Sequence, residues 1–356
     1  MNPRAIVQYL RERVGWQAVG IALSILIIAG ASYVLYHLLS DIEPRQVYAA
    51  LRRTPTYALV LAGIFVAFGY ITLTFYDYFA LRSINREDIP YSTAALASFT
   101  SYAIGHNVGF SVFSGGAVRY RIYSVNGLDA VEVAKICFIA GLTFWLGNVA
   151  FLGLGLIVDP YAANAIDKLP TFANRWLGAA ALLALLGYVV WVSTAPRSIG
   201  VGSERWHVTL PGGRLTLIQI ALGILDLSCA SAAMYMLMPA APQIDFLSLS
   251  VIFVTATLLG FASHSPGGLG VFDAAMLIAL MHFDRQSLIR FGKENVLGAL
   301  LLFRLYYYIV PFALSLAILG VREFILDLKP VAAKLEQKVF RRPSARRPTA
   351  ASRRKK

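Results

Sequence analysis

Charged residues are scarce in this sequence of 356 residues. Asp, Glu, Lys and Arg make up 14% of the chain, whereas the apolar set AVILMFWYC makes up 58%. A typical soluble domain carries about 25% charged residues. The mean hydropathy of +0.63 points the same way. This composition excludes a soluble globule and an intrinsically disordered chain, and it favours a polytopic membrane protein if the apolar residues form long runs.

Cysteine and the common catalytic motifs are also missing or rare. The two cysteines, Cys137 and Cys229, both lie inside apolar runs, so the sequence has neither a disulfide framework nor a metal-ligand spacing. It contains no P-loop, no HExxH and no nucleophile elbow. We therefore predict no catalytic residue, no metal and no cofactor, and any transport would run on substrate or ion gradients.

Acidic residues are few, and the positive excess is concentrated at one end. Lys and Arg number 32 against 19 Asp and Glu, a net charge of +13, and residues 341–356 contain eight basic residues and no acidic one. We expect residues 321–356 to form a basic cytoplasmic tail, disordered over 341–356. Anionic lipid headgroups attract such a tail, and we favour them over nucleic acid as its partner.

Long apolar runs are what the sequence does have. A helix needs about 20 mostly apolar residues to cross the bilayer. Six runs meet this length, roughly 16–39, 56–81, 135–158, 175–195, 215–238 and 296–320. The first follows a basic segment, residues 1–15, like a signal peptide. It is too long for one and lacks a cleavage site, so we expect a retained anchor.

Two further apolar stretches, 92–134 and 247–294, are broken by Gly, Pro, Ser and charge. Each is either two half-helices joined at membrane depth or a pair of short crossings. Both alternatives return the chain to the side from which it came.

Basic residues set the orientation, because cytoplasmic loops carry an excess of Lys and Arg. Residues 1–15, the loop 196–214 and the tail are basic, whereas the loops 159–174 and 239–246 are slightly acidic. We therefore predict that both termini lie in the cytoplasm of a bacterial inner membrane protein. The loop 40–55 then lies outside despite its three arginines.

An internal repeat is suggested when SGGAVRY (114–120) is placed over PGGLGVF (266–272), an offset of 152 residues. The flanking apolar runs then correspond as well. We predict an all-α fold of two membrane repeats, 16–158 and 159–320, each with three spanning helices and one broken hairpin. Three is odd, so the second repeat would enter the membrane from the opposite side, as in many transporters.

The glycine pairs Gly115–Gly116 and Gly267–Gly268 are predicted to be sharp turns, because glycine adopts backbone angles closed to other residues. A helix that starts after such a turn offers free N–H groups to an anion. The alternative is that these small residues only let helices pack closely.

Ionisable residues inside apolar runs suggest function because burying them is costly. We predict that Arg119, Arg121 and Arg304 hold a phosphate, and that Asp226 and Asp273 balance charge or bind a cationic group. The alternative is internal pairing that neutralises buried charge, for instance Asp273 with Arg304.

Other polar residues allow two interpretations. Asp77 lies near Arg82, which favours a surface pair. His106 and His264 flank the two turns and could donate to a phosphate or serve as structural imidazoles. The run Tyr306–Tyr308 favours packing over a binding cage.

The segments FSVFSGGAVRYRIYS (110–124), SHSPGGLGVFDAAM (263–276) and LLFRLYYYIVPF (301–312) together resemble the lysylphosphatidylglycerol synthase transmembrane-region family. The resemblance covers about residues 16–320. It implies a flippase-like membrane domain that moves an anionic or aminoacylated phospholipid between leaflets. In full-length relatives a separate soluble domain attaches the amino acid, and we expect that domain to be missing here.

Three functions follow from these observations. The first is a lipid flippase or transporter, with phospholipid as substrate and the bilayer as surroundings. The second is an integral-membrane lipid-modifying enzyme, for which His264 and Asp273 would supply acid–base chemistry. The third is a non-transporting membrane partner of a soluble lipid-modifying enzyme.

Overall fold

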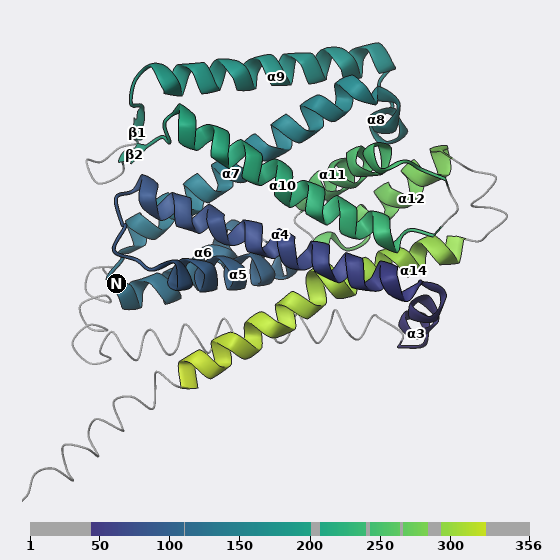
Figure 1. Cartoon of the computed structure of the whole chain (residues 1–356), viewed down its shortest axis with the longest axis horizontal. Coiled ribbons are helices and arrows are strands. Elements are labelled where there is room, and N and C mark those ends of the chain that lie inside the picture. The colour runs from purple at the N-terminus through teal and green to yellow at the C-terminus, as the bar shows by residue number, and fades with distance from the viewer. Residues whose placement is uncertain are drawn as a thin grey trace, which may run out of the picture. The chain divides into compact units, whose positions relative to one another are not determined.

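The fold is almost entirely helical. The computed structural model describes residues 44–109, 111–200, 207–239, 243–263, 266–283 and 293–324 (Figure 1). Within these ranges the only sheet is one antiparallel pair of short strands, β1 (Ser198–Gly200) and β2 (His207–Thr209).

Six described segments are long and apolar enough to cross a membrane. They are α4 (Thr56–Ser83), α7 (Ala130–Val158), α9 (Thr171–Thr194), α10 (Gly213–Leu237), Pro266–Phe283 and Asn295–Phe324. All of the predicted runs except the first coincide with one of these segments, and 16–39 lies outside the described residues. The predicted all-α, polytopic membrane protein is therefore confirmed.

Each broken stretch is a pair of helices. The first contains α5 (Tyr91–Val108) and α6 (Ser111–Tyr123), and the second contains α11 (Phe246–Ala262) and α12 (Val271–Phe283). The second helix of each pair has 13 residues. A helix of that length extends about 20 Å, less than the hydrocarbon core of about 30 Å. Together with the turn before it, α12 makes up the candidate span Pro266–Phe283 named above, whereas α6 alone is too short to cross.

The turn between α5 and α6 does not lie where the sequence predicts it. Gly115 and Gly116 are inside α6, and the chain turns at Gly109, which has a φ of 80°. A Cβ on Gly115 would lie 3.1 Å from the carbonyl oxygen of Ser101. This pair of glycines therefore lets α5 and α6 pack closely, and the predicted turn is wrong at these two residues.

The second glycine pair does form the predicted turn. Gly267 and Gly268 lie in a short turn, η2 (Pro266–Gly268), with φ values of 58° and 63°, and Gly270 follows at 78°. These left-handed angles favour glycine at each position.

Short helices also occupy the connections. Helices α3 (Pro44–Arg53) and α8 (Pro160–Asp167) lie within the predicted loops 40–55 and 159–174. A 3₁₀ turn, η1 (Ser124–Asn126), joins α6 to α7. Helix α7 then begins with a capping box: Glu132 N–H donates to Asp129 Oδ1 at 2.8 Å, and Asp129 N–H donates to the Glu132 carboxylate at 2.9 Å.

The spanning helices pack through small residues. Helices α4 and α10 lie side by side in Figure 1. Where α7 meets α10, a Cβ on Gly147 would collide with the backbone of Gly223 and the reverse, so the two glycines let the backbones touch. Helix α9 packs on α7, but only 11% of its most apolar window is buried, which leaves an apolar surface suited to lipid.

The order of elements recurs along the chain. A long helix, a broken hairpin and a second long helix occur as α4, α5–α6 and α7, and again as α10, α11–α12 and the segment from Asn295. The inverted relation between the two sets stays a prediction, as do the domain boundaries.

A second compact unit comprises residues 317–356. Its described part, up to Phe324, is helical and contains an ion pair between Arg322 and Glu323 at 3.1 Å. The predicted basic tail beyond Phe324 lies outside the described residues.

Candidate functional site

Arg304 and Asp273 form an ion pair within the membrane-spanning part of the chain. Arg304 Nη2 donates to Asp273 Oδ2 at 2.5 Å and Arg304 Nε donates to Oδ1 at 3.1 Å. The Asp273 side chain is 23% exposed and that of Arg304 is 9% exposed. The pair that the sequence suggested as an alternative therefore exists, and the Asp273 carboxylate remains partly exposed.

The turn η2 supplies a third partner for Arg304. Arg304 Nη1 donates to the carbonyl oxygen of Gly267 at 2.9 Å, and the N–H of Gly270 donates to Asp273 at 3.2 Å. A Cβ on Gly267 would lie 3.6 Å from Arg304 Nη1. The second glycine motif thus positions both members of the ion pair, which links it to the site.

Arg304 begins a segment of π-helix, η3 (Arg304–Ile309), which follows α14 (Lys293–Phe303). Single π-turns are frequent at functional sites. Carbonyl oxygens of this segment accept hydrogen bonds from other helices: Tyr307 O from Tyr70 Oη at 3.0 Å and Tyr308 O from Asn107 Nδ2 at 3.1 Å. Helices α4 and α5 therefore hold the irregular segment in place.

A second ion pair, Arg119 with Asp77, is enclosed by protein. Arg119 donates three hydrogen bonds of 2.8 to 3.1 Å to the two carboxylate oxygens, and Tyr123 Oη adds one of 2.9 Å. The Asp77 side chain has no exposed surface. The predicted surface pair of Asp77 with Arg82 is therefore wrong. Arg82 instead lies over the ring of Tyr78, at 4.3 Å.

Asp226 is the third intramembrane acid and has no arginine partner in the part of the chain that the structure describes. It is 5% exposed, and its closest polar contact is Tyr76 Oη, 3.5 Å from Oδ2. Its Oδ1 has no hydrogen-bond partner among the described residues. The sequence predicted this burial from the position of Asp226 in the middle of an apolar run.

The remaining candidate residues are not all brought together. Arg121 is half-buried on α6. His106, at the end of α5, stacks on Tyr307 with ring centroids 6.3 Å apart. His264 lies outside the described residues. Arg119 and Arg304 have separate acidic partners, so the structure shows two arginine sites.

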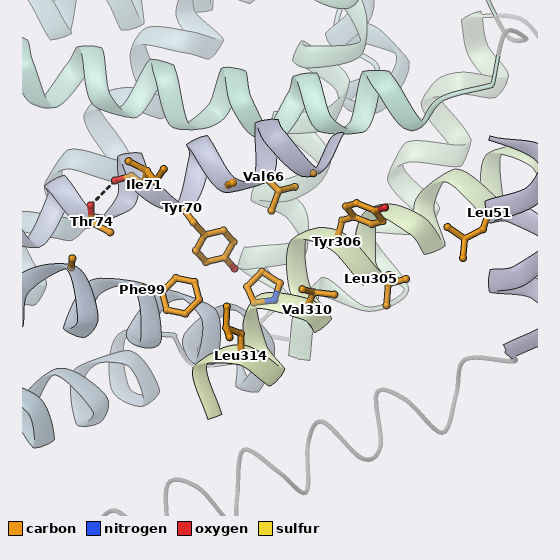
Figure 2. A pocket seen from close by; sticks show the side chains of 14 residues that line it. Leu51, Val66, Tyr70, Ile71, Thr74, Phe99, Leu305, Tyr306, Val310 and Leu314 are labelled. Atoms are coloured by element: carbon orange, nitrogen blue, oxygen red, sulfur yellow. Dashed lines mark hydrogen bonds between the residues drawn. The ribbon is translucent and has the colours of Figure 1, made fainter. Parts of the chain in front are cut away.

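An apolar cavity of about 820 Å³ lies beside the π-helix (Figure 2). Its walls come from α3, α4, α5, and the helix after Arg304. Lining residues from these elements include Leu51, Val66, Tyr70, Phe99, Tyr306 and Leu314. Ile71, Val310 and Leu314 are about half exposed at 50%, 52% and 51%, so the cavity opens on an apolar surface.

Sequence reasoning missed this cavity and the partner of Asp77. No sequence pattern marks a cavity formed by helices far apart in the chain. For Asp77 a signal was available: it sits seven residues after Tyr70 on the same apolar run, which places it inside the membrane span. Within the described ranges, no cluster of three or more His, Cys, Asp or Glu could hold a metal ion.

Comparisons with known proteins agree with this architecture. Residues 18–315 match the family described as the lysylphosphatidylglycerol synthase TM region. Uncharacterized protein slr0712 of Synechocystis is 29% identical over 315 residues, which cover 88% of this chain and 93% of that protein. The inner membrane protein YbhN of Escherichia coli is 24% identical over 276 residues, 77% and 83% of the two chains.

A third relative is much longer than the matched region. The phosphatidylglycerol lysyltransferase of Staphylococcus haemolyticus is 26% identical over 302 residues, which cover 82% of this chain but 32% of that protein. The family match extends over most of the sequence and includes both ion pairs and the cavity. This chain therefore belongs to the lysylphosphatidylglycerol synthase transmembrane-region family.

Proposed function

We propose that this protein moves an anionic or aminoacylated phospholipid of the phosphatidylglycerol type, or a related lipid-linked molecule, between the two leaflets of the membrane. The family and the name of the lysyltransferase relative support a role in phospholipid biology. We also propose a bacterial inner membrane location, which the match to YbhN supports, with both termini in the cytoplasm.

The observation that carries the proposal is an apolar cavity beside the chain segment that bears a partly exposed ion pair. Leu305 and Tyr306 line the cavity, and they directly follow Arg304 in the chain. Asp273 is the more exposed member of the pair. A phospholipid has the same two-part chemistry, with acyl chains that suit the cavity and a phosphate that suits a guanidinium.

The chemistry of the exchange follows from the cost of buried charge. Arg304 is stabilised in the membrane only while an anion accompanies it. A lipid phosphate that displaces Asp273 from Arg304 keeps the arginine paired and leaves Asp273 for a cationic aminoacyl group. The carbonyl oxygen of Gly267 holds the guanidinium during the exchange. The acyl chains remain in the apolar cavity and the surrounding lipid.

The Arg119–Asp77 pair has a different proposed role. The pair is buried, Arg119 donates hydrogen bonds to both carboxylate oxygens of Asp77, and the contact joins α6 to α4. We propose that this pair keeps the first hairpin fixed while the second hairpin exchanges partners. If the two repeats are inverted, as predicted, alternating access would arise from motion of one against the other.

The test uses purified protein in liposomes that contain fluorescently labelled phosphatidylglycerol or its aminoacylated form. Access of a membrane-impermeant quencher to the outer leaflet reports movement of the label. We expect the double variant Arg304→Ala, Asp273→Ala to lose translocation. The matched control, Arg82→Ala, removes a span-end arginine that lies on a tyrosine ring. Unaltered translocation by the double variant would contradict the proposal.

Lipid analysis separates this function from a lipid-modifying enzyme. Mass spectrometry of membranes from expressing and deleted cells shows whether lipid identity changes. A transporter alters only the sidedness of a lipid, whereas an enzyme alters its mass.

A further inference from the structure

Asp226 differs from Asp77 and Asp273, the acids of the two ion pairs described above. Asp77 and Asp273 each accept hydrogen bonds from an arginine. Asp226, at the centre of α10, is as buried as Arg119, at 5% exposure, but no cation lies within ion-pair distance among the described residues. The structure thus neutralises two acids with arginines and leaves the third to be neutralised in another way.

The groups that face Asp226 are all neutral at ordinary pH. They are Tyr70 and Tyr76 on α4, Tyr102 on α5, Tyr307 on the π-helix and Cys229 on α10 itself. Helices α7, α9, α11 and α14 also pack against α10, and none of their described residues places a charged group against Asp226. Two aromatic rings connect Asp226 with Arg119: Tyr76 packs on Tyr102, and Arg119 lies over the ring of Tyr102.

One oxygen of the carboxyl also lacks a polar partner among the described residues. A Cβ on Gly69 would lie 3.7 Å from Asp226 Oδ1, an ordinary contact, and Oδ1 has no hydrogen-bond partner in the described ranges. Tyr76 Oη approaches the other oxygen at 3.5 Å, the outer limit of a hydrogen bond. An ionised carboxylate with so few donors is strongly disfavoured in an apolar interior, whereas the neutral acid is tolerated there.

We propose that Asp226 is a proton-binding site, and that its carboxyl couples lipid movement to the proton gradient across the membrane. The coupling rests on the proposed function. The carboxylate takes one H⁺ from water on one side of the membrane and forms an O–H bond, and the neutral acid then sits in the buried site. When α10 and α4 rearrange so that Asp226 meets water on the other side, the bond breaks and the proton leaves.

Two contacts connect this site to the cavity and the exchanging ion pair. Tyr70 lines the cavity, faces Asp226 and donates to the carbonyl oxygen of Tyr307. Tyr307 belongs to the π-helix that begins at Arg304. A change of charge at Asp226 therefore acts, through Tyr70 and Tyr307, on the segment that holds Arg304. This contact links protonation of Asp226 to lipid binding at Arg304.

The first experiment tests proton binding without any lipid assay. Infrared difference spectra of the purified, reconstituted protein are recorded over a pH series, and the carbonyl stretch of protonated carboxyl groups is followed. We expect a band that titrates in wild type, is absent in Asp226→Asn and persists, shifted, in Asp226→Glu. The control Asp245→Asn, in a loop, leaves the band in place. A band unchanged in Asp226→Asn would overturn the proposal.

The second experiment tests coupling in the liposome assay. A pH gradient of one unit shifts the steady-state distribution of labelled lipid by up to about tenfold for each proton moved. We expect wild type and Asp226→Glu to respond, Asp226→Asn to give no response, and a protonophore to abolish the effect. If Asp226→Asn responds as wild type does, or if wild type moves lipid with no response, the coupling is wrong while the proposed function survives. If wild type moves no lipid at any pH, the proposed function is wrong, and the infrared band alone then decides proton binding.

Discussion

Arg119 on α6 donates hydrogen bonds to both carboxylate oxygens of Asp77 on α4, at 2.8 to 3.1 Å, and neither side chain is more than 6% exposed. Tyr102 covers the guanidinium, 4.8 Å from the ring centroid, and Tyr123 donates to Asp77. Both carboxylate oxygens and the guanidinium in this cluster have partners, so the cost of burying two charges is offset by their mutual contacts.

Breaking this pair is therefore expected to destabilise the protein. Asp77→Ala leaves an unpaired buried guanidinium and should cost about 3–5 kcal/mol. Asp77→Leu combined with Arg119→Met removes both charges and should cost much less than either single change. Thermal unfolding of the detergent-solubilised protein, followed by circular dichroism, measures both. As a control, Arg82→Ala should change stability by less than about 1 kcal/mol. A loss for the double variant equal to the sum of the losses for Asp77→Leu and Arg119→Met alone would show that the two side chains are not coupled.

The apolar cavity gives a prediction about transport rate. Ala67 lines the cavity on α4, so Ala67→Trp would fill much of the space beside Tyr70 and Tyr306. We expect translocation to fall about tenfold, equivalent to about 1.4 kcal/mol of barrier. Ala180→Trp on the exposed face of α9 makes the same substitution away from the cavity. Comparable rates for both variants in the liposome assay would show that acyl chains do not use the cavity.

Much of the fold was predictable because it depends on local composition. Runs of about 20 apolar residues predict spanning helices whatever their neighbours are, and α4, α7, α9 and α10 follow this rule. The broken hairpins were also predictable, since Gly and Pro interrupt helices wherever they occur. The exact position of the first turn was not predictable. Gly115 lets α6 pack closely against Ser101 of α5, and no local sequence pattern specifies this contact between helices.

Pairing inside the site was less predictable for the same reason. Asp77 has an arginine five residues away along the chain, but its partner is Arg119, 42 residues away. A helix places residues i and i+5 on different faces, so proximity in sequence was misleading. Asp273 with Arg304 was anticipated because both stand alone in apolar runs. The π-helix that presents Arg304 has no sequence signature and became visible only in the structure.

The crossing of α7 and α10 predicts that replacing two glycines of α7 with alanine has different effects on stability. Gly147→Ala would place a methyl group in the backbone of Gly223, and the resulting strain should cost about 1–3 kcal/mol. Gly141, also on α7, has nothing within 4 Å of the position that an alanine methyl would take, so Gly141→Ala should be neutral or stabilise by about 0.5–1 kcal/mol. Unfolding temperatures in detergent compare the two. Similar values would show that the two helices do not cross at these glycines.

The orientation predicted from basic loops can be measured on either end of α9. In a variant lacking Cys137 and Cys229, we introduce one cysteine at exposed Thr171 or at exposed Ser198. A membrane-impermeant thiol reagent added to intact cells should label Thr171→Cys only, and Ser198→Cys should react after the membrane is opened. The reverse pattern would place both termini outside the cytoplasm.

The start of α11 gives a pH-dependent prediction outside the membrane spans. Partial burial opposes ionisation of Asp245, but the Ser248 hydroxyl and the N–H groups of Ser248 and Leu247 donate to its carboxylate and lower its pKa. A carboxyl with a lowered folded pKa stabilises the protein above its unfolded pKa of about 3.9, and this stabilisation is lost as the pH falls through the folded value.

Asp245→Ala should therefore lower stability at neutral pH by about 1 kcal/mol, the usual cost of losing a helix N-cap, and the difference from wild type should shrink in acid. Asp245→Asn keeps an N-cap but cannot ionise, so it should lose less at neutral pH. Its smaller difference from wild type should also shrink in acid, because the stabilisation that disappears is that of ionised Asp245 in wild type. Unfolding temperatures measured in detergent from pH 7 to about pH 3 resolve the two effects. A difference between Asp245→Ala and wild type that stays constant over this range would show that ionised Asp245 is not what stabilises α11.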